Sequence, residues 1–254
     1  MKVYFVGAGP GDPELITVKG RRLLEQAGVI IYAGSLVNPA LLAWAHPEAV
    51  CYDSSSLTLE EIVEIMEGAV RRGREVVRLH TGDPSLYGAI REQMEALEAR
   101  GIPYEVVPGV SSFSAAAAAL GREFTVPGRS QTLILTRRGG RTPVPQAENL
   151  RALSAHRASL CLFLSAHCLE EATAELACGY GEQTPAAVVY KASWPEEKVI
   201  WGSLEDIAAK ARQEGIERTA LLLVGDFLAG PYQRSCLYHP SFGHGYRKVE
   251  KSGG

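Results

Sequence analysis

The sequence predicts an α/β fold made of two units, the first with a mainly parallel sheet and the second with a mixed sheet. Three observations lead to this prediction. In the first half, short apolar runs alternate with segments of helical periodicity, which is typical of a parallel sheet covered by helices. Residues 121–130 carry two glycines and a proline and interrupt this alternation. In the second half, strand-like runs at 186–191 and 198–202 are separated by only a few residues, a spacing that allows a hairpin but not a helical crossover.

The first half supplies four clear strands and four helices. Thr17 is a favourable N-cap residue, and it precedes the first helical segment. The last helix contains five consecutive alanines, which allow close packing against a neighbour. Strands are expected at residues 3–6, 29–33, 75–79 and 104–107, and helices at 18–27, 59–72, 87–100 and 112–120.

The second half contains five strand-like and three helix-like segments. Strands are expected at residues 132–136, 160–164, 186–191, 198–202 and 219–224, and helices at 147–153, 169–177 and 204–212. We therefore expect an N-terminal unit at residues 1–124 and a C-terminal unit at residues 131–239. Residues 240–254 are rich in glycine, serine and charge, and we expect them to form a flexible tail.

The composition restricts the classes of function. The chain has 254 residues, of which 46% are hydrophobic and 22% charged, and its formal net charge is -3. It lacks the basic excess that is typical of nucleic-acid-binding domains. Its longest apolar runs are strand-sized, and its first residues show no signal-peptide pattern. The five cysteines form no C-x-x-C pair, which indicates reduced thiols. We expect a cytoplasmic protein with neither a nucleic-acid nor a membrane partner.

Three glycine-containing loops follow strands of the first unit. They are residues 7–13 (GAGPGDP), residues 81–88 (TGDPSLYG) and residues 108–112 (PGVSS). The carboxyl ends of parallel strands meet at one edge of a sheet, where α/β proteins bind ligands. Taken singly, each loop also fits a tight turn without a ligand. Together the loops predict a ligand cleft, but composition alone does not name the ligand.

The loops do not fit the common nucleotide-binding or hydrolase motifs. A Rossmann fingerprint needs G-x-G-x-x-G and an acidic residue about 20 residues later. Here the third glycine comes too early, and residues 32–35 (YAGS) offer no acid. No Walker A sequence occurs, and Ser112 lacks the glycine of a G-x-S-x-G elbow. The six histidines have no metal-ligand spacing, so we expect no metal. A nicotinamide oxidoreductase and a non-catalytic binding module remain as rival classes.

The loop strings resemble those of the tetrapyrrole methyltransferase family. They are GAGPGDPELITVKG from Gly7, GDPSLYGA from Gly82 and PGVSS from Pro108, and the resemblance continues over nearly the whole chain. Members of this family use S-adenosylmethionine. The resemblance implies two α/β domains with a cofactor cleft between them, S-adenosylmethionine as the cofactor, and a homodimer.

Three further strings are similar to one branch of that family. They are residues 32–39 (YAGSLVNP), 141–145 (RTPVP) and 189–195 (VYKASWP). This branch methylates carbon 11 of precorrin-4 in cobalamin biosynthesis, so the resemblance implies that the acceptor is precorrin-4 or cobalt-precorrin-4. A methyltransferase for another carbon of the precorrin or uroporphyrinogen macrocycle stays an alternative.

The resemblance also implies which residues bind the cofactor. They are Pro10, Gly82, Asp83, Leu86, Ser111, Ser112, Leu164 and Ala192. No catalytic residue is identified, although Asp83 is a candidate because its carboxylate can interact with the positively charged cofactor. The alternative role for Asp83 is a structural cap of its loop.

The implied acceptor bears several carboxylates, so its binding surface should present cations. Arg137 and Arg138 follow a strand and are candidates for this role, together with Lys191 and Arg122. The alternative interpretation of the arginines is a solvated basic loop.

Overall fold

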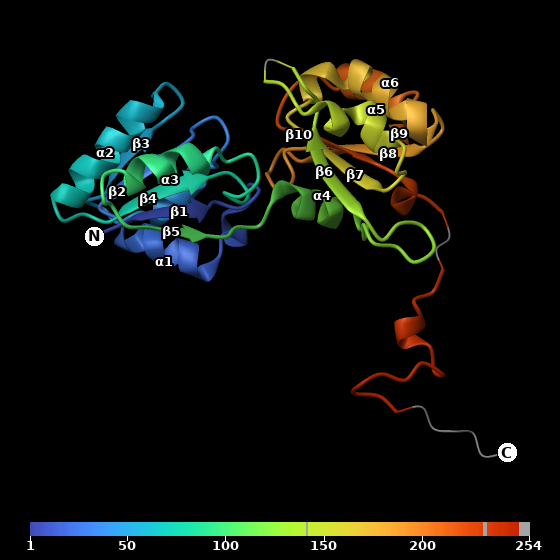
Figure 1. The fold of residues 1–254 in the computed structure, drawn as a ribbon, viewed down its shortest axis with the longest axis horizontal. Helices are drawn as coiled ribbons and strands as arrows, with labels where there is room; N and C mark the ends of the chain where they lie inside the picture. Colours follow the sequence, from blue (N-terminus) through green and yellow to red (C-terminus); the bar gives the residue numbers. More distant parts are fainter. Residues whose placement is uncertain (141, 231–232, 249–254) are drawn as a thin grey trace.

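The computed structural model of the chain describes residues 1–140, 142–230 and 233–248, and Figure 1 shows two five-stranded sheets side by side. The first sheet has the strand order β3-β2-β4-β1-β5, and all its strands are parallel. The second has the order β6-β7-β10-β8-β9, in which β6 and β7 pair in parallel and the other neighbours pair antiparallel. The predicted fold class, with one parallel and one mixed sheet, is confirmed.

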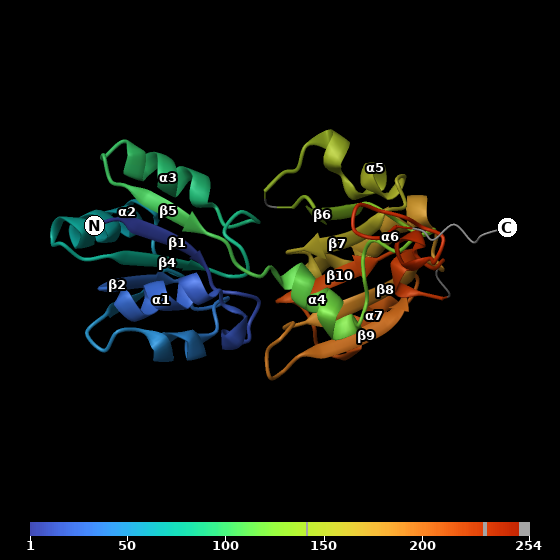
Figure 2. The ribbon, with the colours of Figure 1, turned by 90° about the horizontal axis from the view of Figure 1, so that it is seen from below.

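The first sheet has helices on both faces. Its strands are β1 (Val3–Gly7), β2 (Val29–Tyr32), β3 (Val50–Asp53), β4 (Val76–His80) and β5 (Tyr104–Val107), and its helices are α1 (Val18–Gln26), α2 (Leu59–Arg71) and α3 (Ile90–Glu98). Helix α1 lies on one face, and α2 and α3 lie on the other (Figures 1 and 2). The Thr17 side chain accepts a hydrogen bond from the Gly20 amide, as expected of an N-cap.

The second sheet is also covered on both faces. Its strands are β6 (Leu133–Arg137), β7 (Ser159–Phe163), β8 (Pro185–Tyr190), β9 (Lys198–Ser203) and β10 (Ala220–Val224), and its helices are α4 (Ser112–Leu120), α5 (Leu150–Ser154), α6 (Leu169–Tyr180) and α7 (Ile207–Gln213). Leu150, Leu176 and Ile207 bring α5, α6 and α7 into the core on one face. Strands β8 and β9 form the predicted hairpin.

Helix α4 packs with the second sheet although it follows the last strand of the first. Ala115, Ala116 and Leu120 share a buried cluster with Cys161 and Leu223. The chain therefore crosses from one sheet to the other between β5 and α4 (Figure 1). The expected unit boundary after residue 124 stays a prediction, and this packing favours a boundary nearer residue 111.

Two first-half elements differ from the sequence prediction. Strand β3 was not predicted, because Val50 and Cys51 are exposed at the edge of the sheet and leave no buried apolar pattern to detect. Helix α3 begins at Ile90 and not at residue 87. Tyr87 and Ala89 have φ values of 56° and 47°, which lie outside the helical region, so the helix cannot start earlier.

Short 3-10 helices complete the described chain. They span Pro13–Leu15, Pro39–Trp44, Gln146–Glu148, Ala166–Cys168, Asp226–Leu228 and Cys236–Tyr238. In the expected tail, the Arg247 guanidinium donates to the carbonyl oxygens of Leu237 and His239, and residues 249–254 lie outside the described part of the chain. Among the residues that the structure describes, no helix has the length and apolarity needed to span a membrane.

Two ionisable side chains are buried beneath α3. Arg78 donates hydrogen bonds, each at 3.4 Å, to the Gln93 side chain and to the carbonyls of Ile31 and Leu79. The ring of His80 lies 5.9 Å from that of Phe5, and its Nε2 atom has no hydrogen-bond partner among the described residues. Burial and the nearby Arg78 charge lower the pKa of His80 to about 3. His80 is therefore a packed, neutral histidine at a strand end.

The ends of β1, β4 and β5 approach more closely than side chains would allow. A Cβ atom on Gly7 would lie 2.5 Å from the Gly109 Cα and 2.7 Å from the Gly82 carbonyl oxygen. A Cβ atom on Gly109 would lie 2.2 Å from the same oxygen. Because these contacts involve backbone atoms, no side-chain movement relieves them.

We predict that Gly7→Ala lowers the free energy of unfolding by about 1–3 kcal/mol, the range for overpacking a close-packed site. Urea unfolding measures this difference. Gly140→Ala is the matched control, because a Cβ atom there meets nothing within 4 Å. Equal unfolding midpoints for Gly7→Ala and wild type would contradict the close packing.

We predict that His80→Leu reduces the acid sensitivity of the fold. Between pH 6.5 and 3 the unfolded chain binds a proton at this histidine and the folded chain does not, so stability falls as pH decreases. The wild type should lose about 2 kcal/mol between pH 7 and pH 5 through this group, and the variant should not. Urea unfolding at both pH values tests this, with the exposed His156→Gln as control. A pH-dependent loss of the same size in His80→Leu and wild type would refute it.

Candidate active site

The three glycine loops meet at the carboxyl edge of the first sheet. Their strands β4, β1 and β5 are neighbours, so the chain leaves all three at one place. The Gly82 amide donates to the Gly9 carbonyl at 2.8 Å, and the Gly9 amide donates back to the Gly82 carbonyl at 3.3 Å. The third loop is also close, because a Cβ atom on Gly82 would lie 3.4 Å from the Ser111 Cα. The predicted convergence of the loops is therefore confirmed.

Asp83 joins the second loop to the third. Its Oδ2 atom accepts a hydrogen bond of 2.8 Å from the Gly109 amide. Its Oδ1 atom accepts one of 2.8 Å from the Ser85 amide and another from the Ser85 hydroxyl. Burial acts to raise the pKa of Asp83, but these hydrogen bonds outweigh burial and the pKa is lowered. The ionised carboxylate thus caps its own loop and holds the neighbouring one, which is the structural role considered for it.

The other first-sheet candidates lie around this junction. Pro10 and Gly82 are buried, and Leu86 is half-buried. Ser111 is buried at the N-cap of α4, yet its side chain makes no capping hydrogen bond to the helix. Ser112 is the first residue of that helix. A hydroxyl that does not cap its helix is free to serve a ligand, and the start of a helix favours negative groups.

A loop of the second sheet docks onto the first glycine loop. The Trp194 Nε1 atom donates to the Pro10 carbonyl at 2.9 Å, and the Asp12 amide donates to the Ser193 hydroxyl at 2.9 Å. The indole lies so close to Gly11 that a Cβ atom there would be 2.0 Å from the Trp194 Cδ1 atom. The buried Ala192 precedes this pair and belongs to the core cluster that α4 forms with the second sheet.

A second contact between the sheets involves the end of β7. The Phe163 ring lies 5.4 Å from the ring of Tyr87, which belongs to the second glycine loop. The next residue, Leu164, has a φ of 53° and is 60% exposed. Leu164 thus follows the end of β7 with a left-handed backbone and an exposed apolar side chain.

The candidate substrate-binding cations are held by the protein itself. The Arg137 guanidinium donates to the carbonyls of Thr142 and Pro143 at 3.0 and 2.8 Å. Arg138 forms an ion pair of 2.8 Å with Glu175. The Lys191 Nζ atom lies 3.4 Å from a Glu196 carboxylate oxygen and 5.1 Å from the centre of the Trp194 ring.

These contacts favour the structural interpretation of the arginine loop over free guanidinium forks. Arg141, the first residue of a string used for the branch, lies outside the described residues. Arg122 faces the ring of Trp201 at 5.6 Å. Binding of an acceptor by Arg137, Arg138 or Lys191 stays a prediction.

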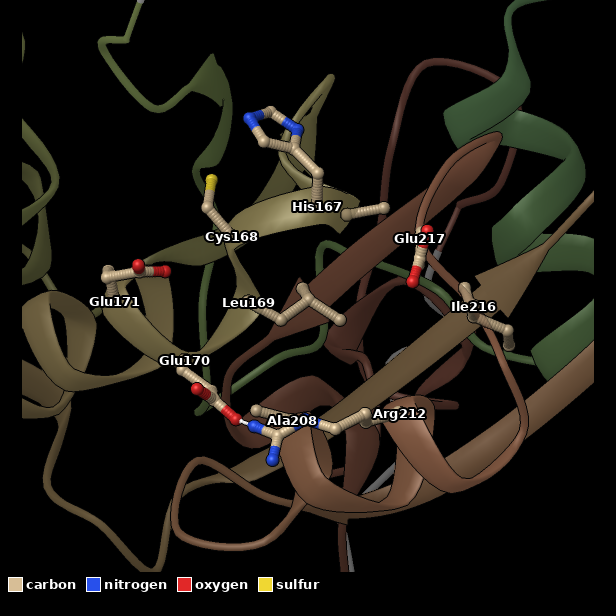
Figure 3. A pocket seen from close by; sticks show the side chains of 10 residues that line it. His167, Cys168, Leu169, Glu170, Glu171, Ala208, Arg212, Ile216 and Glu217 are labelled. Carbon is tan, nitrogen blue, oxygen red and sulfur yellow. Dashed lines mark ion pairs between the residues drawn. The ribbon is translucent and has the colours of Figure 1, made fainter.

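A cavity of about 440 Å³ is lined by none of the predicted site residues. Figure 3 shows the side chains around it. The cavity lies between the start of α6 and the end of α7, and Glu170 and Arg212 form an ion pair across it. Within the described ranges, no cluster of three or more His, Cys, Asp or Glu side chains is arranged to hold a metal.

Sequence reasoning missed several residues that build the junction. Trp194 and Ser193 stood in a branch-specific string without a role, and Tyr87 was assigned to a helix. Asn38, whose Nδ2 atom donates to the Gly11 carbonyl at 2.8 Å, stood in another such string. The available signal for Trp194 was an indole three residues after the predicted strand at 186–191. Nothing in the sequence indicated its partner, Pro10.

Comparisons with known proteins agree with this geometry. The family model described as "Tetrapyrrole (Corrin/Porphyrin) Methylases" matches residues 2–208. A Cobalt-precorrin-4 C(11)-methyltransferase of Methanocaldococcus jannaschii is 52% identical over 98% of this chain and 97% of its own. A Precorrin-4 C(11)-methyltransferase of Pseudomonas aeruginosa is 50% identical over 98% of this chain and its own full length.

Solved structures give the same result. A cobalt precorrin-4 methyltransferase is similar with a TM-score of 0.88 and 47% identity, over 90% of this chain and 96% of its own. A uroporphyrin-III C-methyl transferase from Thermus thermophilus, complexed with S-adenyl homocysteine, has a TM-score of 0.74 and 31% identity, over 90% of this chain and 93% of its own. The chain belongs to the family of tetrapyrrole (corrin/porphyrin) methylases.

Proposed function

We propose that this chain transfers the methyl group of S-adenosylmethionine to carbon 11 of precorrin-4 or cobalt-precorrin-4. The observation that carries the proposal is the junction of the three glycine loops with the Ser193–Trp194 segment. The names of the relatives that align over nearly the whole chain support the choice of acceptor and carbon. The family resemblance further leads us to propose a cytoplasmic homodimer.

The residues at the junction fit S-adenosylmethionine. Gly9 and Gly109, where a Cβ atom would meet backbone atoms, let the loops of the junction pack closely against one another. The Ser111 hydroxyl, which caps nothing in its own helix, can hydrogen-bond the polar part of the cofactor. Leu164 offers an exposed apolar surface for the adenosine. These residues (Gly9, Gly109, Ser111 and Leu164) form the cradle of the proposed cofactor site. The cradle combines closely packed backbone, a hydroxyl that does not cap its helix and an exposed apolar side chain.

The chemistry asks the protein chiefly for positioning. When bound, S-adenosylmethionine supplies a methyl group that is attached to a positively charged sulfur. After the transfer, this sulfur is a neutral thioether. Residues of both sheets hold the two reactants in line, and such alignment contributes roughly 7–11 kcal/mol to lowering a barrier. The ionised Asp83 adds a fixed negative charge beside the cradle, and the docked Trp194 covers the first loop and excludes water from it.

We predict that the purified chain binds S-adenosylhomocysteine stoichiometrically in calorimetry and does not bind NAD. With labelled S-adenosylmethionine it should methylate precorrin-4, cobalt-precorrin-4 or both, and NMR of the product should place the new methyl group on carbon 11. Offering both acceptors side by side decides which form is the substrate.

Three outcomes would count against the proposal. Binding of NAD in place of S-adenosylhomocysteine would restore the oxidoreductase alternative. A methyl group on another carbon would assign the chain to another step of macrocycle methylation. If the chain neither binds S-adenosylhomocysteine nor transfers a methyl group, the result would point to a non-catalytic module.

A further inference from the structure

Tyr87 has a backbone conformation that tyrosine rarely adopts. Its φ is 56°, in the left-handed region, and Ala89 two residues later has a φ of 47°. Gly88 between them makes the turn tight, because a Cβ atom there would lie 2.3 Å from the Pro84 carbonyl oxygen. A non-glycine residue in this region costs about 1–2 kcal/mol. Such strain is concentrated at functional sites, and glycine at position 87 would avoid it.

The strained backbone directs the Tyr87 ring across the gap between the sheets. The ring lies 5.4 Å from that of Phe163, tilted by 48°, and Phe163 is the last residue of β7. Phe163 is 8% exposed, whereas Tyr87 is 43% exposed. One side of the tyrosine therefore packs on the second sheet, and much of its ring stays open.

A second strained residue faces the same gap. Leu164 follows Phe163, has a φ of 53° and is 60% exposed. Two non-glycine residues from different sheets thus accept left-handed backbone, and both present exposed apolar side chains at the place where the sheets meet. Leu164 is the residue proposed for the adenosine, so Tyr87, which packs against the neighbouring Phe163, lies beside the proposed cofactor site.

The polar features of this surface narrow the class of ligand. Burial raises the pKa of the Tyr87 phenol, so the hydroxyl stays protonated and can donate a hydrogen bond. The Arg137 charge acts on the same phenol, and its guanidinium is held by the Thr142 and Pro143 carbonyls. An open aromatic ring, a neutral donor and a nearby cation suit a flat, conjugated molecule with carboxylate groups.

We propose that Tyr87 is an acceptor-binding residue: its open ring packs on the tetrapyrrole, and its hydroxyl donates a hydrogen bond to it. The proposal rests on the proposed function and deepens it, since it assigns the acceptor to the exposed side of Tyr87. Pro10 and Ser111 then serve the cofactor, and Tyr87 serves the acceptor.

Two substitutions at Tyr87 test this assignment. Tyr87→Gly removes the ring and relieves the left-handed strain, so it should fold. It should raise the KM for the tetrapyrrole at least about tenfold, the loss expected for one good aromatic contact. Tyr87→Phe keeps the ring and removes only the hydroxyl, and should raise KM about fivefold, as for one hydrogen bond. Both variants should bind S-adenosylhomocysteine within twofold of wild type.

A stable polycarboxylate porphyrin, titrated by fluorescence quenching, measures acceptor binding without turnover. Its Kd should rise in the same order, and Tyr246→Phe, at a fully exposed tyrosine, should change nothing. Wild-type KM and porphyrin Kd in Tyr87→Gly would overturn the assignment, as would a matching loss of S-adenosylhomocysteine affinity. If the wild type binds the porphyrin but transfers no methyl group, the proposed function fails while the porphyrin titration still decides the role of Tyr87.

Discussion

The site depends on close approach at positions where a Cβ atom has no room. Gly7 and Gly109 let the ends of β1 and β5 lie against the Gly82 carbonyl, and Gly11 lets the indole of Trp194 lie on the first loop. The first set of contacts joins three loops of one sheet. The last one brings the second sheet to them. The three loops and the second sheet therefore meet because Gly7, Gly109 and Gly11 carry no side chain.

Asp83 shows how this constraint divides roles among residues. Its carboxylate accepts hydrogen bonds from the Ser85 and Gly109 amides, so it fixes the two loops. It also leaves a negative charge at the carboxyl edge of the first sheet. The strained backbone at Tyr87 and Leu164 has the opposite effect, since it costs stability and turns apolar side chains toward the gap between the sheets. Rigid loops on one side and strained, exposed side chains on the other are what a site for two reactants requires.

The sequence predicted the fold class and the convergence of the loops because both follow from local patterns, namely apolar periodicity and glycines after strands. It did not predict β3, an exposed edge strand, or the late start of α3, which a left-handed turn at Tyr87 imposes. It also missed the contact between Trp194 and Pro10, which are 184 residues apart and pair only through the tertiary fold. Arg137 and Arg138 have the right charge to bind a substrate with carboxylate groups. Their partners within the chain, the Thr142 carbonyl and the Glu175 carboxylate, could not be predicted from sequence because tertiary structure brings them together.

We propose that close approach at Gly11 lets the second sheet complete the cofactor site. The most direct test is the Kd of S-adenosylhomocysteine for Gly11→Ala, measured by calorimetry beside Gly140→Ala. One added methyl group would meet the Trp194 ring and break its hydrogen bond to Pro10. We expect the affinity to be weakened at least about tenfold in Gly11→Ala and to be unchanged in Gly140→Ala. Wild-type affinity in a folded Gly11→Ala variant would contradict it.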